Sequence, residues 1–138
     1  MLDRFFAFIA DLTGEPQRGF EEGDYRVAAA ALLVHVMAAD GEIAEAERAK
    51  LKSVLSEGFD LSDEDTRRLI AAATDAEAAE ENWTSFADVL VHRLDEGARR
   101  RIVDMMWSVV LADGRAHELE EAVVERAAVI LGVEARVS

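Results

Sequence analysis

The sequence contains no cysteine, which excludes disulfide bonds, thiolate nucleophiles and cysteine-ligated zinc or iron–sulfur sites. Proline occurs once and glycine eight times in 138 residues, so little in the chain interrupts helix formation. Basic residues are in the minority, with 15 Lys and Arg against 29 Asp and Glu, and the formal net charge is -14. Because nucleic acid requires clustered Lys and Arg, we expect no nucleic-acid partner, and instead a cation or a basic protein.

Long hydrophobic runs are also missing. No apolar run approaches the roughly 18 residues that a transmembrane helix needs, so we expect no transmembrane segment. The apolar stretch Phe5–Ala10 near the N-terminus is short, is flanked by Asp3 and Asp11, and is not followed by a small-residue cleavage site. These features argue against a signal peptide and predict a cytoplasmic protein.

The residues that are present describe one soluble globular domain. Hydrophobic residues make up 51% and charged residues 32% of the chain, which is a globular and not a disordered composition. Residues 1–24 predict an amphipathic helix, Leu2–Leu12, and a Gly/Pro-containing linker that pack on the domain formed by residues 25–138. A membrane-surface helix is the alternative for Leu2–Leu12, but its two aspartates suit anionic lipid poorly.

The hydrophobic pattern predicts an all-α fold, a compact bundle of about seven helices, because no alternating strand pattern occurs. Two mostly apolar stretches, Tyr25–Ala39 and Ile102–Val110, are expected at the centre of the bundle. The other helices are expected at Leu2–Leu12, Ala44–Glu57, residues 62–81, residues 82–97 and Leu119–Leu131. Ser62 is the expected N-cap of its helix, and Gly58 and Gly132 are expected to end theirs.

A fourteen-residue segment occurs twice. Val36–Ala49 and Val109–Ala122, which are offset by 73 residues, share seven identical positions, including Ala-Asp-Gly and two glutamates. Each copy lies between a mostly apolar helix and an amphipathic helix. The repeat therefore predicts an internal pseudo-twofold relation within the bundle.

The repeated segment has a purely structural interpretation. Gly41 and Gly114 tolerate the left-handed backbone conformation that ends a helix. Glu47 and Glu120 fall at the third position of the following helix, where a glutamate accepts a hydrogen bond from the N-cap backbone N–H. This is half of a capping box, since Ala44 has no side-chain acceptor for the other half.

A divalent-cation site is the functional interpretation. Calcium takes six to eight oxygen ligands from carboxylates, carbonyls and water, and both copies are rich in carboxylates. The spacing is not that of an EF-hand. Arg115 in the second copy replaces Glu42 of the first, and His117 suits a transition metal better than calcium. The candidate metal ligands are Asp40, Glu42, Glu45, Glu47, Asp113, Glu118 and Glu120.

The chain resembles the tellurite resistance protein B (TerB) family in two segments, AAALLVHVMAADGEIAEAERAKL and RRRIVDMMWSVVLADGRAHELEEAVVERAAVILGV. The resemblance covers residues 25–133. It implies an all-helical fold with internal pseudo-symmetry, an acidic surface around the repeated turns, a suggested role in metal-ion binding, and an association with tellurite resistance and other stress responses. The residues carried over by position are Asp40, Glu47, Asp113 and Glu120, whereas Arg115 stands where the family commonly has an acidic residue.

No nucleophile elbow, P-loop, dinucleotide fingerprint or H-x-x-x-H pattern occurs, so we expect no enzyme. His35 lies on the apolar stretch and is expected to be a hydrogen-bonded core or rim histidine. The sequence therefore predicts a TerB-like accessory module that requires no cofactor and has candidate sites for a divalent cation. The alternative is a protein-interaction module whose acidic face binds a basic partner while the turns are structural, and a metal-using hydrolase is a weaker third class.

Overall fold

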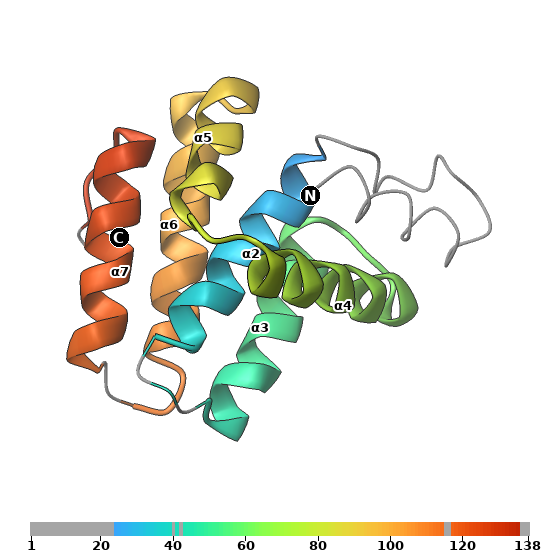
Figure 1. The fold of residues 1–138 in the computed structure, drawn as a ribbon. Helices are drawn as coiled ribbons and strands as arrows, with labels where there is room; N and C mark the ends of the chain where they lie inside the picture. Colours follow the sequence, from blue (N-terminus) through green and yellow to red (C-terminus); the bar gives the residue numbers. More distant parts are fainter. Residues whose placement is uncertain (1–23, 40, 42, 115–116, 136–138) are drawn as a thin grey trace.

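The computed structural model describes residues 24–39, 41, 43–114 and 117–135. Within these ranges the chain forms six α-helices and no strand, which confirms the all-α prediction (Figure 1). The helices are α2 (Tyr25–Met37), α3 (Glu45–Gly58), α4 (Asp63–Ala79), α5 (Thr84–Arg93), α6 (Glu96–Val110) and α7 (Glu118–Leu131). The seventh predicted helix, Leu2–Leu12, and most of its linker lie outside the described residues.

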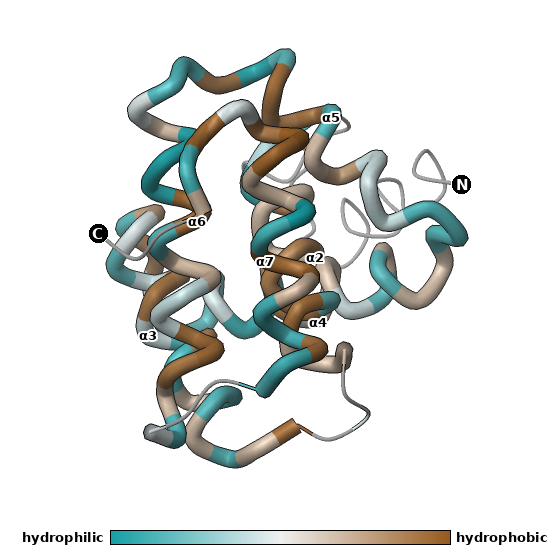
Figure 2. Tube along the Cα trace, turned by 90° about the vertical axis from the view of Figure 1, so that its left-hand side faces the viewer, coloured by the Kyte–Doolittle hydropathy of each residue, from teal (hydrophilic) through white to brown (hydrophobic). Residues whose placement is uncertain are grey.

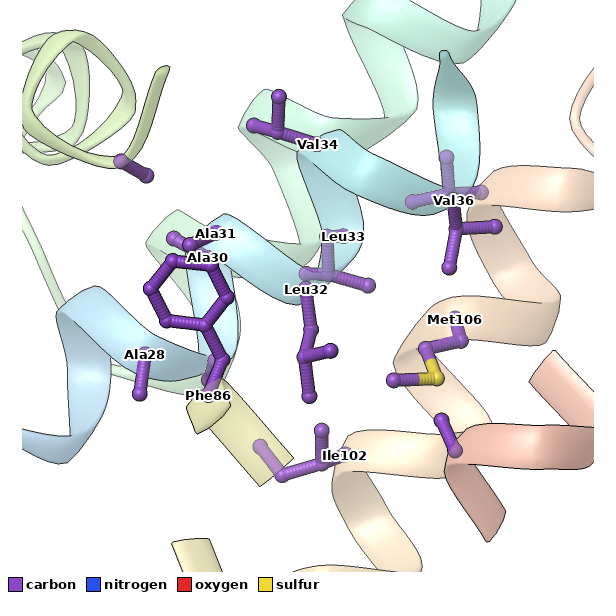
Figure 3. Close-up of a cluster of buried hydrophobic side chains, with 14 of the residues drawn as sticks. Ala28, Ala30, Ala31, Leu32, Leu33, Val34, Val36, Phe86, Ile102 and Met106 are labelled. Carbon is purple, nitrogen blue, oxygen red and sulfur yellow. The ribbon is translucent and has the colours of Figure 1, made fainter. Parts of the chain in front are cut away.

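Helix α2 is the centre of the bundle. Ten of its 13 residues are buried, and it packs against each of the other five helices (Figures 1 and 3). Its side chains Leu32 and Leu33 are completely buried, and Figure 3 shows them among Phe86 of α5 and Met106 of α6. A helix that is apolar on nearly all sides is stabilised in this position, because most of its side chains are removed from water.

The prediction of two central helices holds for α2 only. Helix α6 packs against α2, α3 and α7 and buries six of its 15 residues. Its first turns carry Arg99 and Arg100, which are partly buried, and Arg101, which is exposed, so α6 has a charged side near its N-terminal end.

Four helices pair in a pattern that agrees with the internal repeat. Exchanging α2 with α6 and α3 with α7 leaves the set of helix contacts unchanged: α2 with α3 corresponds to α6 with α7, and α2 with α7 corresponds to α6 with α3. Helices α4 and α5 break this relation, because α4 packs on α2 and α3 whereas α5 packs on α2 and α7. The pseudo-twofold relation therefore extends to four helices and not to the whole bundle.

Several helix ends follow from local sequence signals. The side chain of Ser62 accepts a hydrogen bond from the backbone N–H of Asp65 at 3.1 Å, as predicted for an N-cap. Asp24 caps α2 and Asp95 caps α6 in the same manner. Gly132 ends α7 with a φ of 74°, and its left-handed conformation lets Val133 N–H reach the carbonyl of Ala128 at 3.1 Å.

Gly58 is the last residue of α3, as predicted, and the left-handed position after the helix belongs to Asp60, with a φ of 55°. Asp60 can take this role because a short polar side chain tolerates the left-handed region. Gly97 was expected at a helix end but lies in the first turn of α6, because Asp95 caps the helix two residues earlier.

Hydrogen bonds from α6 side chains hold the end of α7 and the segment that follows it. Arg99 donates to the carbonyl of Leu131, Arg100 to that of Glu134, and the indole N–H of Trp107 to that of Ala135. The first of these bonds satisfies a carbonyl at the C-terminal end of α7, where the helix dipole favours a cation. Within the described residues, no helix has the length and apolar character needed to cross a membrane.

Candidate functional site

The first Asp-Gly turn leaves α2 through a short series of backbone hydrogen bonds. Ala38 N–H donates to Val34 O at 3.1 Å, Ala39 N–H to Val36 O at 3.2 Å, and Gly41 N–H to Ala38 O at 3.0 Å. Gly41 has a φ of 84°, a conformation that L-residues with a side chain rarely adopt. The turn therefore requires glycine at this position, because the backbone takes a positive φ there.

The second turn repeats these bonds 73 residues later. Leu111 N–H donates to Trp107 O at 2.9 Å, Ala112 N–H to Val109 O at 3.2 Å, and Gly114 N–H to Leu111 O at 3.0 Å. Gly114 has a φ of 93°. Both turns lie at the same end of the molecule, where α3 and α7 begin (Figures 1 and 2). The sequence repeat thus corresponds to a repeat of main-chain structure.

A glutamate is buried beneath each turn. Glu47 is 1% exposed and Glu120 is 0% exposed, and Thr66 is the only other buried polar residue within the described ranges. Thr66 makes a local hydrogen bond to the carbonyl of Ser62 at 2.7 Å, as hydroxyl groups in helices commonly do. A buried carboxylate is more costly and needs a compensating partner. The two matched glutamates are therefore the unusual feature of this end of the molecule.

Only one of the two carboxylate oxygens of Glu47 has a hydrogen-bond partner among the described residues. Its Oε1 accepts from the backbone N–H of Ala44 at 3.4 Å, a long bond that confirms the predicted half capping box. Its Oε2 has no hydrogen-bond partner among the described residues. The capping role therefore accounts for one oxygen of this buried carboxylate.

The second turn differs because a potential cation lies beside its aspartate. His117 Nε2 lies 3.5 Å from Asp113 Oδ2, and both side chains are partly exposed. In the first turn, the residue equivalent to His117 is Ala44, which has no such group. Asp113 thus has an ion-pair partner, His117, at the end of its own turn.

The remaining predicted ligands are not brought together by the described residues. Glu45 and Glu118, in the first turns of α3 and α7, are both exposed. Asp40 and Glu42 lie outside the described residues, as does Arg115. In the ranges that the structure covers, no three His, Asp or Glu side chains form a group that could hold a metal ion.

On another part of the domain, His35 connects α2 with α4 and with the N-cap residue of α5. His35 Nδ1 of α2 lies 2.9 Å from Glu77 Oε2 of α4, and its ring stacks on Trp83 with centroids 4.9 Å apart. This confirms the expectation of a hydrogen-bonded rim histidine. The two partners lie 42 and 48 residues further along the chain, so periodicity within one helix carried no signal for them.

The chain matches a known protein family. The family described as "Tellurite resistance protein TerB" matches residues 26–138, which is nearly all of the chain after the predicted linker. Comparisons with curated proteins and with solved structures gave no significant match.

Proposed function

Because the chain belongs to the tellurite resistance protein TerB family, we propose that it is a non-catalytic accessory module that binds a divalent cation at its first Asp-Gly turn. Stress response is the physiological context that this family membership favours. The proposal rests on one observation above all. Glu47 is buried and has an oxygen without a hydrogen-bond partner among the described residues.

The energetic argument concerns that oxygen. An unsatisfied buried polar group costs about 1–3 kcal/mol, and more when it is charged. Desolvation also makes an isolated buried carboxylate a strong ligand for a cation, because water no longer competes for its lone pairs. A cation bound at Oε2 would offset this cost and would leave the hydrogen bond from Ala44 to Oε1 in place.

The ligand chemistry favours a hard cation such as calcium. Calcium takes oxygen ligands in flexible geometry, and carboxylates, carbonyls and water all serve. Besides Glu47, the first turn offers Asp40, Glu42 and Glu45 within eight residues of sequence. Glu45 is exposed, so in this proposal it binds from the solvent side while Glu47 binds from the buried side.

The second turn is the weaker candidate. Asp113, Glu118 and Glu120 supply carboxylates there, but His117 lies 3.5 Å from Asp113 and the sequence adds Arg115. Positive charge within the turn competes with a metal ion for the same oxygens. We therefore assign the higher affinity to the first turn.

Calorimetric titration of the full chain with calcium, magnesium, manganese and zinc tests the proposal. We expect one ion to bind with a stoichiometry of one and to raise the melting temperature, since a ligand at 100 times its Kd adds about 2.7 kcal/mol of stability. Glu47→Gln should weaken binding at least about tenfold, or ~1.4 kcal/mol. The amide keeps an oxygen for Ala44 N–H, so the variant should remain folded.

Glu120→Gln is the matched control, because it makes the same change at the same depth in the other turn. We expect it to leave the affinity for the ion within about twofold, a difference of ~0.4 kcal/mol. If no ion produces heat or a thermal shift, the cation proposal is wrong. If both variants weaken binding equally, the assignment to the first turn is wrong.

The second candidate function is an interaction module whose acidic face binds a basic protein. The exposed positions of Glu45 and Glu118 at the same end of the molecule favour it (Figure 1), and the net charge of -14 would speed association with a basic surface. In this case the Asp-Gly turns are structural. The role of the buried glutamates is then limited to helix capping.

A lysine-rich peptide serves as the probe for this alternative. Binding should weaken with salt, should be unaffected by a chelator, and should fall when Glu45→Gln and Glu118→Gln are combined. The cation proposal makes the opposite prediction for the chelator. The two functions are therefore distinguished by one titration performed with and without chelator.

A further inference from the structure

A groove of about 320 Å³ lies between the N-terminal end of α2, the C-terminal end of α3 and the side of α6 that runs from Ala98 to Ser108. Its apolar walls include Tyr25, Phe59, Leu94 and Met105, all of which are partly exposed. The rings of Tyr25 and Phe59 meet edge to face with centroids 5.8 Å apart. Gly58 adds depth, since a Cβ at this position would lie 3.3 Å from Met105 Cε.

We propose that this groove is the docking site for the chain's own residues 2–12. These residues carry Leu2, Phe5, Phe6, Ile9 and Leu12 at helical spacing, which places five apolar side chains on one face of a helix. A groove of this volume is in the range of pockets that hold small ligands, about 300–1,000 Å³. It can therefore accept more than one of these side chains.

The position of the groove favours the chain's own segment over other occupants. Tyr25 lines the groove and is the first residue of α2, so the N-terminal segment joins the domain at the groove itself. The linker, residues 14–24, spans at most ~36 Å when extended at roughly 3.3 Å per residue. A tether of this length gives an effective local concentration in the millimolar range, which a free partner has to exceed.

Charge complementarity also favours this occupant. Arg101 lines the groove and makes no ion pair among the described residues, whereas the neighbouring Asp104 is paired with Arg100 at 3.2 Å. Residues 2–12 contain two acidic side chains, Asp3 and Asp11, and one basic side chain, Arg4, a formal net charge of -1 (1 - 2). The segment therefore carries acidic groups that can pair with Arg101.

A paramagnetic label on the full chain tests the docking. Because the sequence lacks cysteine, Glu57→Cys places a single nitroxide on an exposed residue of α3 directly before Gly58. We expect the amide signals of residues 2–12 to lose most of their intensity in the oxidised state and to recover it on reduction. A label at Glu125→Cys, an exposed position on α7, should leave these signals largely unchanged.

Phe5→Ser combined with Phe6→Ser tests the apolar contact, because both positions lie outside the described domain. The double variant should abolish the broadening from Glu57→Cys while the signals of α2–α7 stay in place. Absent broadening, or equal broadening from both label positions, would overturn the proposal. Broadening that appears only when spin-labelled chains are mixed with isotope-labelled chains would also overturn it, because the occupant would then be a second copy.

Discussion

The turn that joins α2 to α3 and the turn that joins α6 to α7 have the same main-chain hydrogen bonds and the same buried glutamate. They differ in the side chains around that frame. The first turn surrounds Glu47 with further carboxylates in the sequence, whereas the second carries His117 within 3.5 Å of Asp113. The two copies have thus kept the main-chain hydrogen bonds and the buried glutamate, while the charged side chains that would decide ligand binding differ.

The helices after the turns have diverged in the same way. In α3, Lys52 pairs with Asp63 of α4 at 2.7 Å, and the position equivalent to Lys52 in α7 is Glu125. Leu51 of α3 corresponds to Val124 of α7, and both are buried. The backbone repeat therefore allows matched substitutions that compare the two halves position by position.

The largest effect is expected from Leu51→Ala, which should lower the free energy of unfolding by about 2–5 kcal/mol. Val124→Ala removes one carbon fewer from an equally buried position and should cost about 0.8 kcal/mol less. Urea denaturation followed by circular dichroism measures both. Lys50→Ala, an exposed change on α3, is the control. A larger loss of unfolding free energy for Val124→Ala than for Leu51→Ala would contradict this expectation and show that α7 contributes more than α3 to stability.

Exchanging the distinguishing residues should move the proposed cation site. Arg115→Glu with His117→Ala gives these two positions of the second turn the side chains of the first, and we expect the calorimetric stoichiometry to rise from one to two. The new affinity should lie within about tenfold of the first, or ~1.4 kcal/mol. The reverse exchange, Glu42→Arg with Ala44→His, should remove binding. Unchanged stoichiometry in a folded variant would contradict the role of local charge.

A smaller effect, equal in the two turns, is expected from the glycines. Gly41→Ala and Gly114→Ala place a side chain at positive φ, where the conformational cost is roughly 1–2 kcal/mol. A Cβ at either position would meet no atom within 4 Å, so this cost is not increased by a clash. Chemical denaturation should give equal losses within about 0.5 kcal/mol. Gly97→Ala, in a helical turn, should be neutral or stabilising, and a loss at Gly97 as large as at the turns would contradict this explanation.

The smallest effect concerns pH. A hydrogen bond from Lys52 lowers the pKa of Asp63 below its usual value. The folded pKa is thus below the unfolded one, so the stabilisation is complete above the unfolded pKa, about 3.9, and is lost as pH falls through the folded pKa. Asp63→Asn should flatten this acid limb of the melting temperature slightly, because the pair is exposed and screened by water.

Glu125→Gln is the control for the pH experiment, since Glu125, which is equivalent to Lys52, makes no ion pair with another described residue. It should leave the acid limb of the melting temperature unchanged. High salt should reduce the difference between wild type and Asp63→Asn. An undiminished difference at high salt would show that the effect is not electrostatic.

The sequence predicted those parts of the fold that depend on neighbouring residues. The cap at Ser62, the left-handed Gly132 and the central position of α2 each follow from a short stretch of chain. The left-handed residue after α3 was not predicted, because it is Asp60 and not a glycine. The centrality of α6 was overestimated because Arg99 and Arg100 bind carbonyls of the segment after α7, which the pattern within one helix does not show.

The site was predictable to a similar extent. The repeat identified both turns and placed Glu47 and Glu120 at equivalent positions, and the half capping box at Ala44 was confirmed. The burial of these two glutamates could not be read from the sequence, because it depends on how α3 and α7 pack beside α2 and α6. The groove at Tyr25 was likewise hidden, since its walls come from three helices. The proposed roles of Asp40 and Glu42 stay predictions.

The central position of α2 has a consequence for hydrogen exchange and for coupling between distant parts of the protein. Since its residues are enclosed by five helices, its amide hydrogens should exchange with solvent only when the whole domain unfolds. The helix is ~20 Å long at 1.5 Å per residue, and it connects the groove at Tyr25 with the turn that follows Met37. A displacement of α2 along its axis at the groove would therefore also displace the turn after Met37. Helix α2 thus links the two proposed sites, as does α3, which carries both Glu47 and Gly58.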